Sequence, residues 1–159
     1  MRSFVCAIAA MAAIMIAAPV SVPAQQQPSG PAYRPGLGDL MTTTIQPRHI
    51  KLAAAGREKN WSYAAYEVHE LDEAFDRASI IWPQWQKLSI VEMIETIVRQ
   101  PLLDLDQAVK EKNERLYNAA YGRLTEACNG CHQAARRGFV VIQDPKDSVY
   151  ADQDFRAQP

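Results

Sequence analysis

The sequence predicts an all-α fold, an antiparallel four-helix bundle, and three observations support this prediction. Apolar residues recur at steps of three and four through much of residues 36–138, which is the period of an amphipathic helix. Alternating β-branched runs are absent before residues 139–142, "FVVI". Capping residues and prolines divide the helical pattern into four segments. Their short connections would make neighbouring helices antiparallel.

Residues 1–24 have the pattern of a secretory signal peptide: Arg2 supplies a positive charge, an apolar run follows, and small residues lead to "VPA". Cleavage is expected at the end of this stretch, which would place the mature chain in the periplasm without a stable membrane span. The alternative is a retained transmembrane anchor, because the apolar run is close to the shortest length that crosses a bilayer. Cleavage would remove Cys6 and leave Cys128 and Cys131 in the mature chain.

Length and charge narrow the function classes. With 159 residues, the chain is long enough for one domain with one core. Its formal net charge is −1 and it has no basic stripe, so nucleic acid is not an expected partner. Residues 25–35 are rich in proline, glutamine and glycine and are expected to form a flexible leader. A four-helix-bundle domain over residues 36–138 and a C-terminal extension over residues 139–159 complete the predicted organisation.

The first two helices are placed by their end signals. The first is expected from about Pro35 to Ala55, since proline suits a first turn and Gly56 is a helix-ending residue. Pro47 lies inside this stretch and should kink it. The second helix should begin after Asn60, a favourable capping residue, and carries one continuous apolar stripe.

A proline and a capping box set the next boundary. The second helix should end at residues 82–85, "WPQW", because the residue before a proline is pushed out of helical geometry. Ser89 and Glu92 have the spacing of a capping box and predict the start of the third helix. Pro101 should bend that helix, which is expected to end near Asn113.

The fourth helix carries the motif with the most chemistry. It is expected over residues 114–137, with Gly138 ending it, and it contains "EACNGCHQAAR". At about 100° per residue, Cys128 and Cys131 share the apolar face of this helix and His132 lies at its edge. All three side chains should therefore point toward the core, and a planar group bound to them would be buried between helices.

Three chemistries fit a C-x-x-C sequence. A thioredoxin-type redox pair usually lies at a helix N-terminus that lowers the thiolate pKa, whereas this motif lies late in a helix. A structural zinc ion needs four ligands, and Cys128, Cys131 and His132 supply at most three. In covalent haem c, two thiols add to the haem vinyl groups and the next residue, a histidine, binds the iron. The C-x-x-C-H sequence in an exported chain favours one covalent haem c per chain.

A four-helix chain with C-x-x-C-H on its last helix resembles the class II c-type cytochromes, the cytochrome c′ family, over roughly residues 36–138. The resemblance implies thioether bonds at Cys128 and Cys131 and His132 as the proximal iron ligand. Low-spin members bind the other face of the iron with a methionine near the start of the first helix, the position of Met41 here. High-spin members leave that face open and bind small gases.

The residues on the inward face of the first helix are the candidates for the second iron ligand. With Ile45 at the centre of the inward face, Met41 and His49 lie about 40° to either side of it. Met41 therefore has two readings, iron ligand or ordinary core packing. His49 is expected at the core edge or near a haem edge, and Met93 in the core of the third helix. His69 lies at the boundary of its apolar stripe and is expected at the surface.

Other conspicuous residues have plainer expectations. Three tryptophans are expected to pack in the core or at the bundle ends, with haem contact as the alternative: Trp61, Trp82 and Trp85. Arg136 and Arg137 follow the motif and would meet either haem propionates or water. Glu67 and Glu70 are expected on a solvated face of the second helix. Residues 139–142 have two open roles, folding back over the haem edge or contacting a partner.

These observations together predict a periplasmic mono-haem c-type cytochrome that carries electrons and is not an enzyme. His132 and Met41 would be its iron ligands, and its partners would be periplasmic redox proteins. The alternative is a five-coordinate protein that binds nitric oxide or carbon monoxide. The resemblance also leaves a homodimer open.

Overall fold

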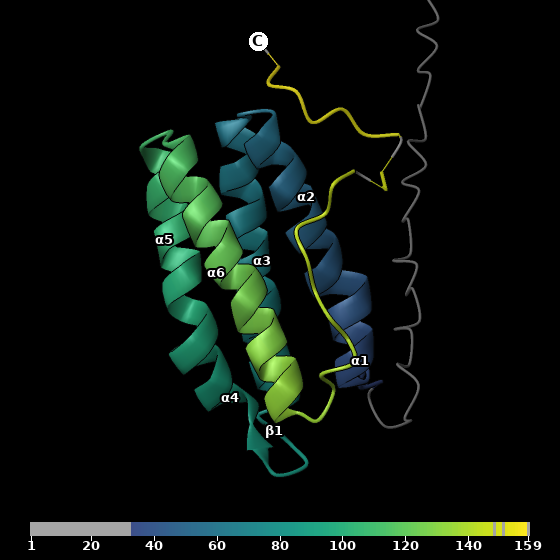
Figure 1. The fold of residues 1–159 in the computed structure, drawn as a ribbon. Helices are drawn as coiled ribbons and strands as arrows, with labels where there is room; N and C mark the ends of the chain where they lie inside the picture. Colours follow the sequence, from purple (N-terminus) through teal and green to yellow (C-terminus); the bar gives the residue numbers. More distant parts are fainter. Residues whose placement is uncertain (1–32, 148, 151, 159) are drawn as a thin grey trace, which may run out of the picture. The chain divides into compact units, whose positions relative to one another are not determined.

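A computed structural model describes residues 33–147, 149–150 and 152–158. The predicted signal peptide and most of the predicted leader lie outside these residues. The elements follow one another along the chain in this order (Figure 1): α1 (Leu37–Leu40), η1 (Met41–Ile45), α2 (Gln46–Arg57), α3 (Trp61–Ile81), β1 (Gln84–Trp85), β2 (Leu88–Ser89), α4 (Ile90–Met93), η2 (Ile94–Val98), α5 (Arg99–Lys110) and α6 (Glu114–Ala134). The predicted all-α class is confirmed for the described part of the chain.

The long helices pack around one apolar core. α2 contacts α3 and α6, and α5 contacts the same two helices (Figure 1). Each of the four contributes a leucine with 0–1% of its surface exposed: Leu52, Leu71, Leu105 and Leu124. None of the helices in the described ranges is long and apolar enough to cross a membrane.

The same tripeptide, Glu-Lys-Asn, connects α2 to α3 and α5 to α6. In both loops the lysine is left-handed, with φ of 53° at Lys59 and 51° at Lys112. In both, the asparagine side chain accepts the backbone N–H three residues on, so Asn60 and Asn113 cap the following helices. The predicted starts of α3 and α6 are confirmed, whereas the helix expected to end near Asn113 ends at Lys110.

A π-helical segment precedes each of the two helical prolines. η1 lies just before Pro47, and η2 lies just before Pro101. Proline lacks an N–H and clashes with the carbonyl four residues back, and a local change to wider π turns accommodates this loss. Each helix therefore continues past its proline, with a π segment before it.

Two glycines do not end helices as predicted. α2 runs through Gly56 to Arg57, and a Cβ at Gly56 would overlap the ring of Tyr117, 2.7 Å from its Cζ. Gly56 is therefore needed for the close approach of α2 and α6. α6 ends at Ala134, and the left-handed residue beyond it is Arg136, not Gly138.

A two-residue hairpin follows α3, which ends at Ile81 as the "WPQW" sequence predicts. β1 and β2 pair antiparallel, with Trp85 opposite Leu88. The Ser89 hydroxyl then accepts the Glu92 N–H over 3.2 Å, which confirms the predicted cap. The hairpin itself was not predicted.

Glu67 is not on a solvated face as predicted. Its side chain is 0% exposed, and its carboxylate lies 3.3 Å from Nη1 of Arg48. The same guanidinium reaches Glu70, with 2.9 Å between Nη2 and Oε2. Glu67 lies between Ala64 and Val68 on the apolar stripe of α3, so the helix phase carries it inward, where the arginine compensates its charge.

The C-terminal extension is held on the start of α3. The Asn60 amide donates to the carbonyl oxygens of Phe155 and Arg156, each over 3.1 Å. Phe155 is buried and packs edge-on against Tyr63. The Gln153 amide also donates to the Tyr63 hydroxyl. The extension thereby covers part of the first turns of α3.

Candidate functional site

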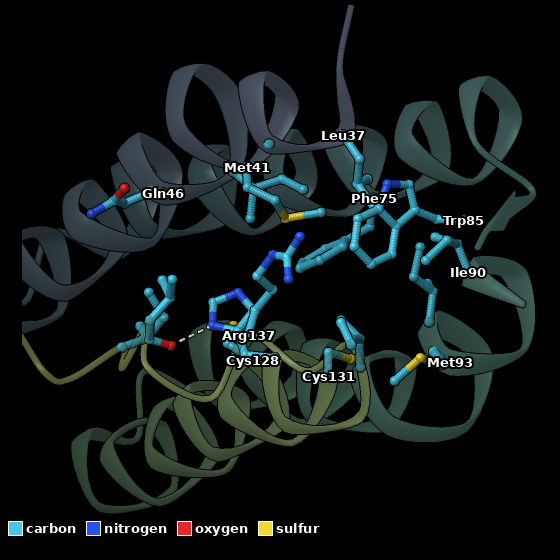
Figure 2. Close-up of a pocket in the computed structure, with 18 of the residues that line it drawn as sticks. Leu37, Met41, Gln46, Phe75, Trp85, Ile90, Met93, Cys128, Cys131 and Arg137 are labelled. Carbon is cyan, nitrogen blue, oxygen red and sulfur yellow. Dashed lines mark hydrogen bonds between the residues drawn. The ribbon is translucent and has the colours of Figure 1, made fainter. Parts of the chain in front are cut away.

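A cavity of about 410 Å³ opens between the first helical segment, α4, η2 and α6. Its walls are almost entirely apolar, with Phe75, Trp85 and Ile90 among the side chains that face it (Figure 2). Both π segments border it, through Ile45 of η1 and Ile94 of η2. Its size and lining are those of a site for a sizeable organic ligand.

The four residues predicted from the sequence as a site all line this cavity. They are Cys128, Cys131 and His132 from α6 and Met41 from η1. In Figure 2 the sulfur of Met41 points into the cavity from the wall opposite Cys128 and Cys131. Two segments that are far apart in the sequence therefore supply facing walls.

The two cysteines have neutral thiols. Neither forms a disulfide. Burial, followed by the neighbouring Cys131, raises the pKa of Cys128 to about 12, and burial also raises the pKa of Cys131. Both lie in the last turns of α6, where the helix dipole disfavours negative charge. The arrangement therefore lacks the thiolate activation of a thioredoxin-type pair.

His132 has a fixed tautomer. Its Nδ1 lies 2.7 Å from the carbonyl oxygen of Val140. A carbonyl can only accept, so Nδ1 carries the proton and Nε2 keeps its lone pair. Among the described residues, nothing is hydrogen-bonded to Nε2. This is the state in which an imidazole binds a metal through Nε2, with the other ring nitrogen held by a backbone carbonyl.

The "FVVI" segment folds back to the motif at the end of α6. Phe139, Val140 and Ile142 border the cavity. No strand forms there.

His49 also borders the cavity, but both of its ring nitrogens are engaged. Nε2 lies 2.9 Å from the Thr125 hydroxyl and Nδ1 lies 2.9 Å from the Tyr121 hydroxyl. The ring stacks on Tyr121 with centroids 4.6 Å apart. Burial lowers the pKa of His49 to about 4, so it is neutral. His49 is thus buried in the core beside the cavity and does not lie at the core edge as expected. The expected surface place of His69, which pairs with Glu73, is confirmed.

Three further residues border the cavity that were not among the predicted site residues. Met93, expected in the core, borders the cavity and adds a second thioether. Its spacing from Ile90 and Ile94 puts all three on one helical face, a signal that was available. Trp85, for which packing was the main expectation and haem contact the alternative, also lines the cavity. No helical period could show this because Trp85 lies in the hairpin. The Cζ atom of Arg137 lies 5.4 Å from the centroid of the Trp85 ring, and Arg137 borders the cavity.

The other two tryptophans pack as expected. Trp61 meets Tyr117 edge-on, with ring centroids 5.7 Å apart. The Trp82 indole N–H donates to the Pro35 carbonyl over 2.9 Å. Neither is part of the cavity wall.

Comparison of this chain with protein-family models, with curated proteins and with solved structures finds no match. The resemblance to class II cytochromes therefore stays a prediction from the motif and the helix pattern. In the described ranges, no group of three or more histidine, cysteine, aspartate or glutamate side chains is arranged to hold a metal ion.

Proposed function

We propose that this chain is an exported mono-haem c-type cytochrome, a four-helix bundle of the class II kind that carries electrons in the periplasm. One observation carries the proposal. Cys128, Cys131, His132 and Met41 come from opposite ends of the helical region and line a single apolar cavity.

The residues present fit a covalently held haem. The cavity is apolar enough for a porphyrin ring, and both cysteines are free thiols beside it. Each thiol would add across a vinyl group, with the sulfur bonding one carbon and the hydrogen going to the other. This addition consumes no oxidant or reductant. His132 follows directly and offers an unprotonated Nε2.

Bound there, haem iron supplies reversible one-electron transfer. His132 would bind one face of the iron, and the Met41 thioether would close the other. A thioether is a soft, neutral ligand that favours reduced iron and raises its potential. The apolar side chains of Phe75 and Trp85 would exclude water, and the Arg137 guanidinium, which also borders the cavity, would pair with a propionate.

Export and partners follow from the sequence. The predicted signal peptide, residues 1–24, would deliver the chain to the periplasm. Loss of Arg2 with the signal peptide would change the formal net charge from −1 to −2. A mildly acidic chain suits redox partners that present a basic patch, through a small interface that releases quickly. A homodimer stays open.

The second candidate is a five-coordinate protein that binds nitric oxide or carbon monoxide. Leu37 and Ile45 flank Met41 on the cavity wall. If the thioether packed among them, these side chains would shield an open iron position.

The absorption spectrum of the reduced full chain, made with intact haem-attachment machinery, tests the electron-carrier proposal. A low-spin spectrum that carbon monoxide does not change is expected. A high-spin spectrum that shifts at once with carbon monoxide would overturn it and favour the second candidate.

A further inference from the structure

The chain beyond α6 returns to the helix it has just left (Figure 1). Arg136 is left-handed, with φ of 55°, and reverses the chain direction. The Val140 N–H then donates to the Arg137 carbonyl over 2.8 Å and closes a tight turn. Residues 139–142 are thereby brought against the last turns of α6.

Asn129 fixes this returning segment with both ends of its side-chain amide. Its Nδ2 donates to the Ile142 carbonyl over 2.8 Å, and its Oδ1 accepts the Ile142 N–H over 2.7 Å. Both backbone polar groups of one residue are satisfied by one side chain, as a neighbouring strand would satisfy them. An aspartate could accept but not donate, so only an amide makes both bonds here.

The fixed segment carries the group that contacts the histidine. Val140 lies two residues before Ile142, and its carbonyl accepts the Nδ1 proton of His132 over 2.7 Å. Asn129 and His132 are three residues apart on α6 and so lie on one side of the helix. The amide, the returning backbone and the imidazole form a closed loop of contacts. Farther on, the Arg57 guanidinium holds the Pro145 carbonyl over 2.6 Å.

We propose that Asn129 is a positioning residue for His132. By holding Ile142, it keeps the Val140 carbonyl on Nδ1, so that the ring stays in the Nδ1–H tautomer and presents an unprotonated Nε2. The inference rests on the proposed function for the identity of what Nε2 binds. A carbonyl on Nδ1 makes a ligating imidazole more basic, which stabilises oxidised iron. We call the two hydrogen bonds between Asn129 and Ile142 the clamp. Loss of the clamp should therefore raise the reduction potential.

Two measurements on the full chain as purified test this role. The first is the His132 Nδ1–H signal in nitrogen-correlated proton spectra of the reduced protein. It should be present in the unmodified chain and lost to solvent exchange in Asn129→Ala. The second is the midpoint potential of the bound haem, which should shift upward in the same variant. Asn129→Asp keeps the acceptor for the Ile142 N–H and should give a smaller change in both.

Asn113→Ala is the matched control. Asn113 caps the start of the same helix, so its loss weakens α6 without touching the clamp. The control should keep both the Nδ1–H signal and the potential of the unmodified chain. The clamp is overturned if Asn129→Ala and Asn129→Asp also keep both. If the purified chain holds no haem, the proposed function fails, and the Nδ1–H signal alone decides whether Asn129 orients His132.

Discussion

The ring of Tyr117 in α6 lies against the backbone of Gly56 in α2, and the Tyr117 hydroxyl donates to the Leu52 carbonyl over 2.6 Å. Any side chain at position 56 must push this ring away.

Gly56→Ala should therefore destabilise the fold by about 1–3 kcal/mol, the usual cost of overpacking a closed core. The matched control is Gly122→Ala. Gly122 is an exposed residue of α6, and a Cβ there would meet nothing within 4 Å. That change should stabilise by roughly 0.5–1 kcal/mol because alanine favours the helix. Urea unfolding of both variants measures the difference. Equal free energies of unfolding would show that Tyr117 does not need the glycine.

Removal of the Arg48 guanidinium should expose the cost of a buried charge. Arg48→Met leaves the fully buried Glu67 carboxylate without its cationic partner, and the expected loss is roughly 3 kcal/mol. Arg77→Met is the control, since Arg77 pairs with Glu73 at the surface, where such a pair contributes at most about 1 kcal/mol. Changing Glu67→Leu in the Arg48→Met background should recover most of the loss. No recovery would mean that the arginine stabilises through packing.

His49 should make the stability depend on pH. Its pKa is about 4 in the folded chain, against about 6.5 when unfolded. Between these values the unfolded chain binds more protons, so the free energy of unfolding falls as the pH falls. The His49 contribution should drop by roughly 3 kcal/mol from about pH 7.5 to about pH 4.

His49→Gln should flatten this part of the profile, measured as the free energy of unfolding against pH. The exposed His69 supplies the comparison, since His69→Gln should follow the unmodified chain. If both variants give the same profile, burial does not disfavour the His49 imidazolium.

The sequence was sufficient for what depends on local signals. Asn60, Asn113 and Ser89 cap helices as their types predict, and the inward phase of Cys128 and Cys131 follows from α6 alone. It was not sufficient where two distant segments meet. Glycine is a residue type that often ends helices, but Gly56 lies inside α2, and its role is to make room for Tyr117 of α6.

Cavity residues outside regular helices were equally hard to predict. Trp85 reaches the cavity through a hairpin, and Val140 reaches His132 through a left-handed turn at an arginine. Neither has a periodic signal. For Glu67 a periodic signal was present but was outweighed by the residue type. Its charge suggested a solvent-exposed position, whereas its place on the apolar stripe of α3 puts it in the core.

Met41→Leu and Met93→Leu form a matched pair for the second iron ligand. Both residues border the cavity, and leucine keeps the volume while removing the sulfur. Met41→Leu should lower the reduction potential, turn the reduced haem high-spin and let carbon monoxide bind, whereas Met93→Leu should leave all three unchanged. If Met93→Leu causes these changes instead, the ligand comes from α4. If neither does, the gas-binding candidate is the better account.

The most direct test of the central claim is extraction of denatured protein with acidified organic solvent. The full chain is made with intact haem-attachment machinery and compared with a Cys128→Ser/Cys131→Ser variant. We predict that haem stays with the unmodified polypeptide, one per chain, and that the variant releases whatever haem it holds. Haem that leaves the unmodified chain, or a chain purified without haem, would contradict covalent attachment at Cys128 and Cys131.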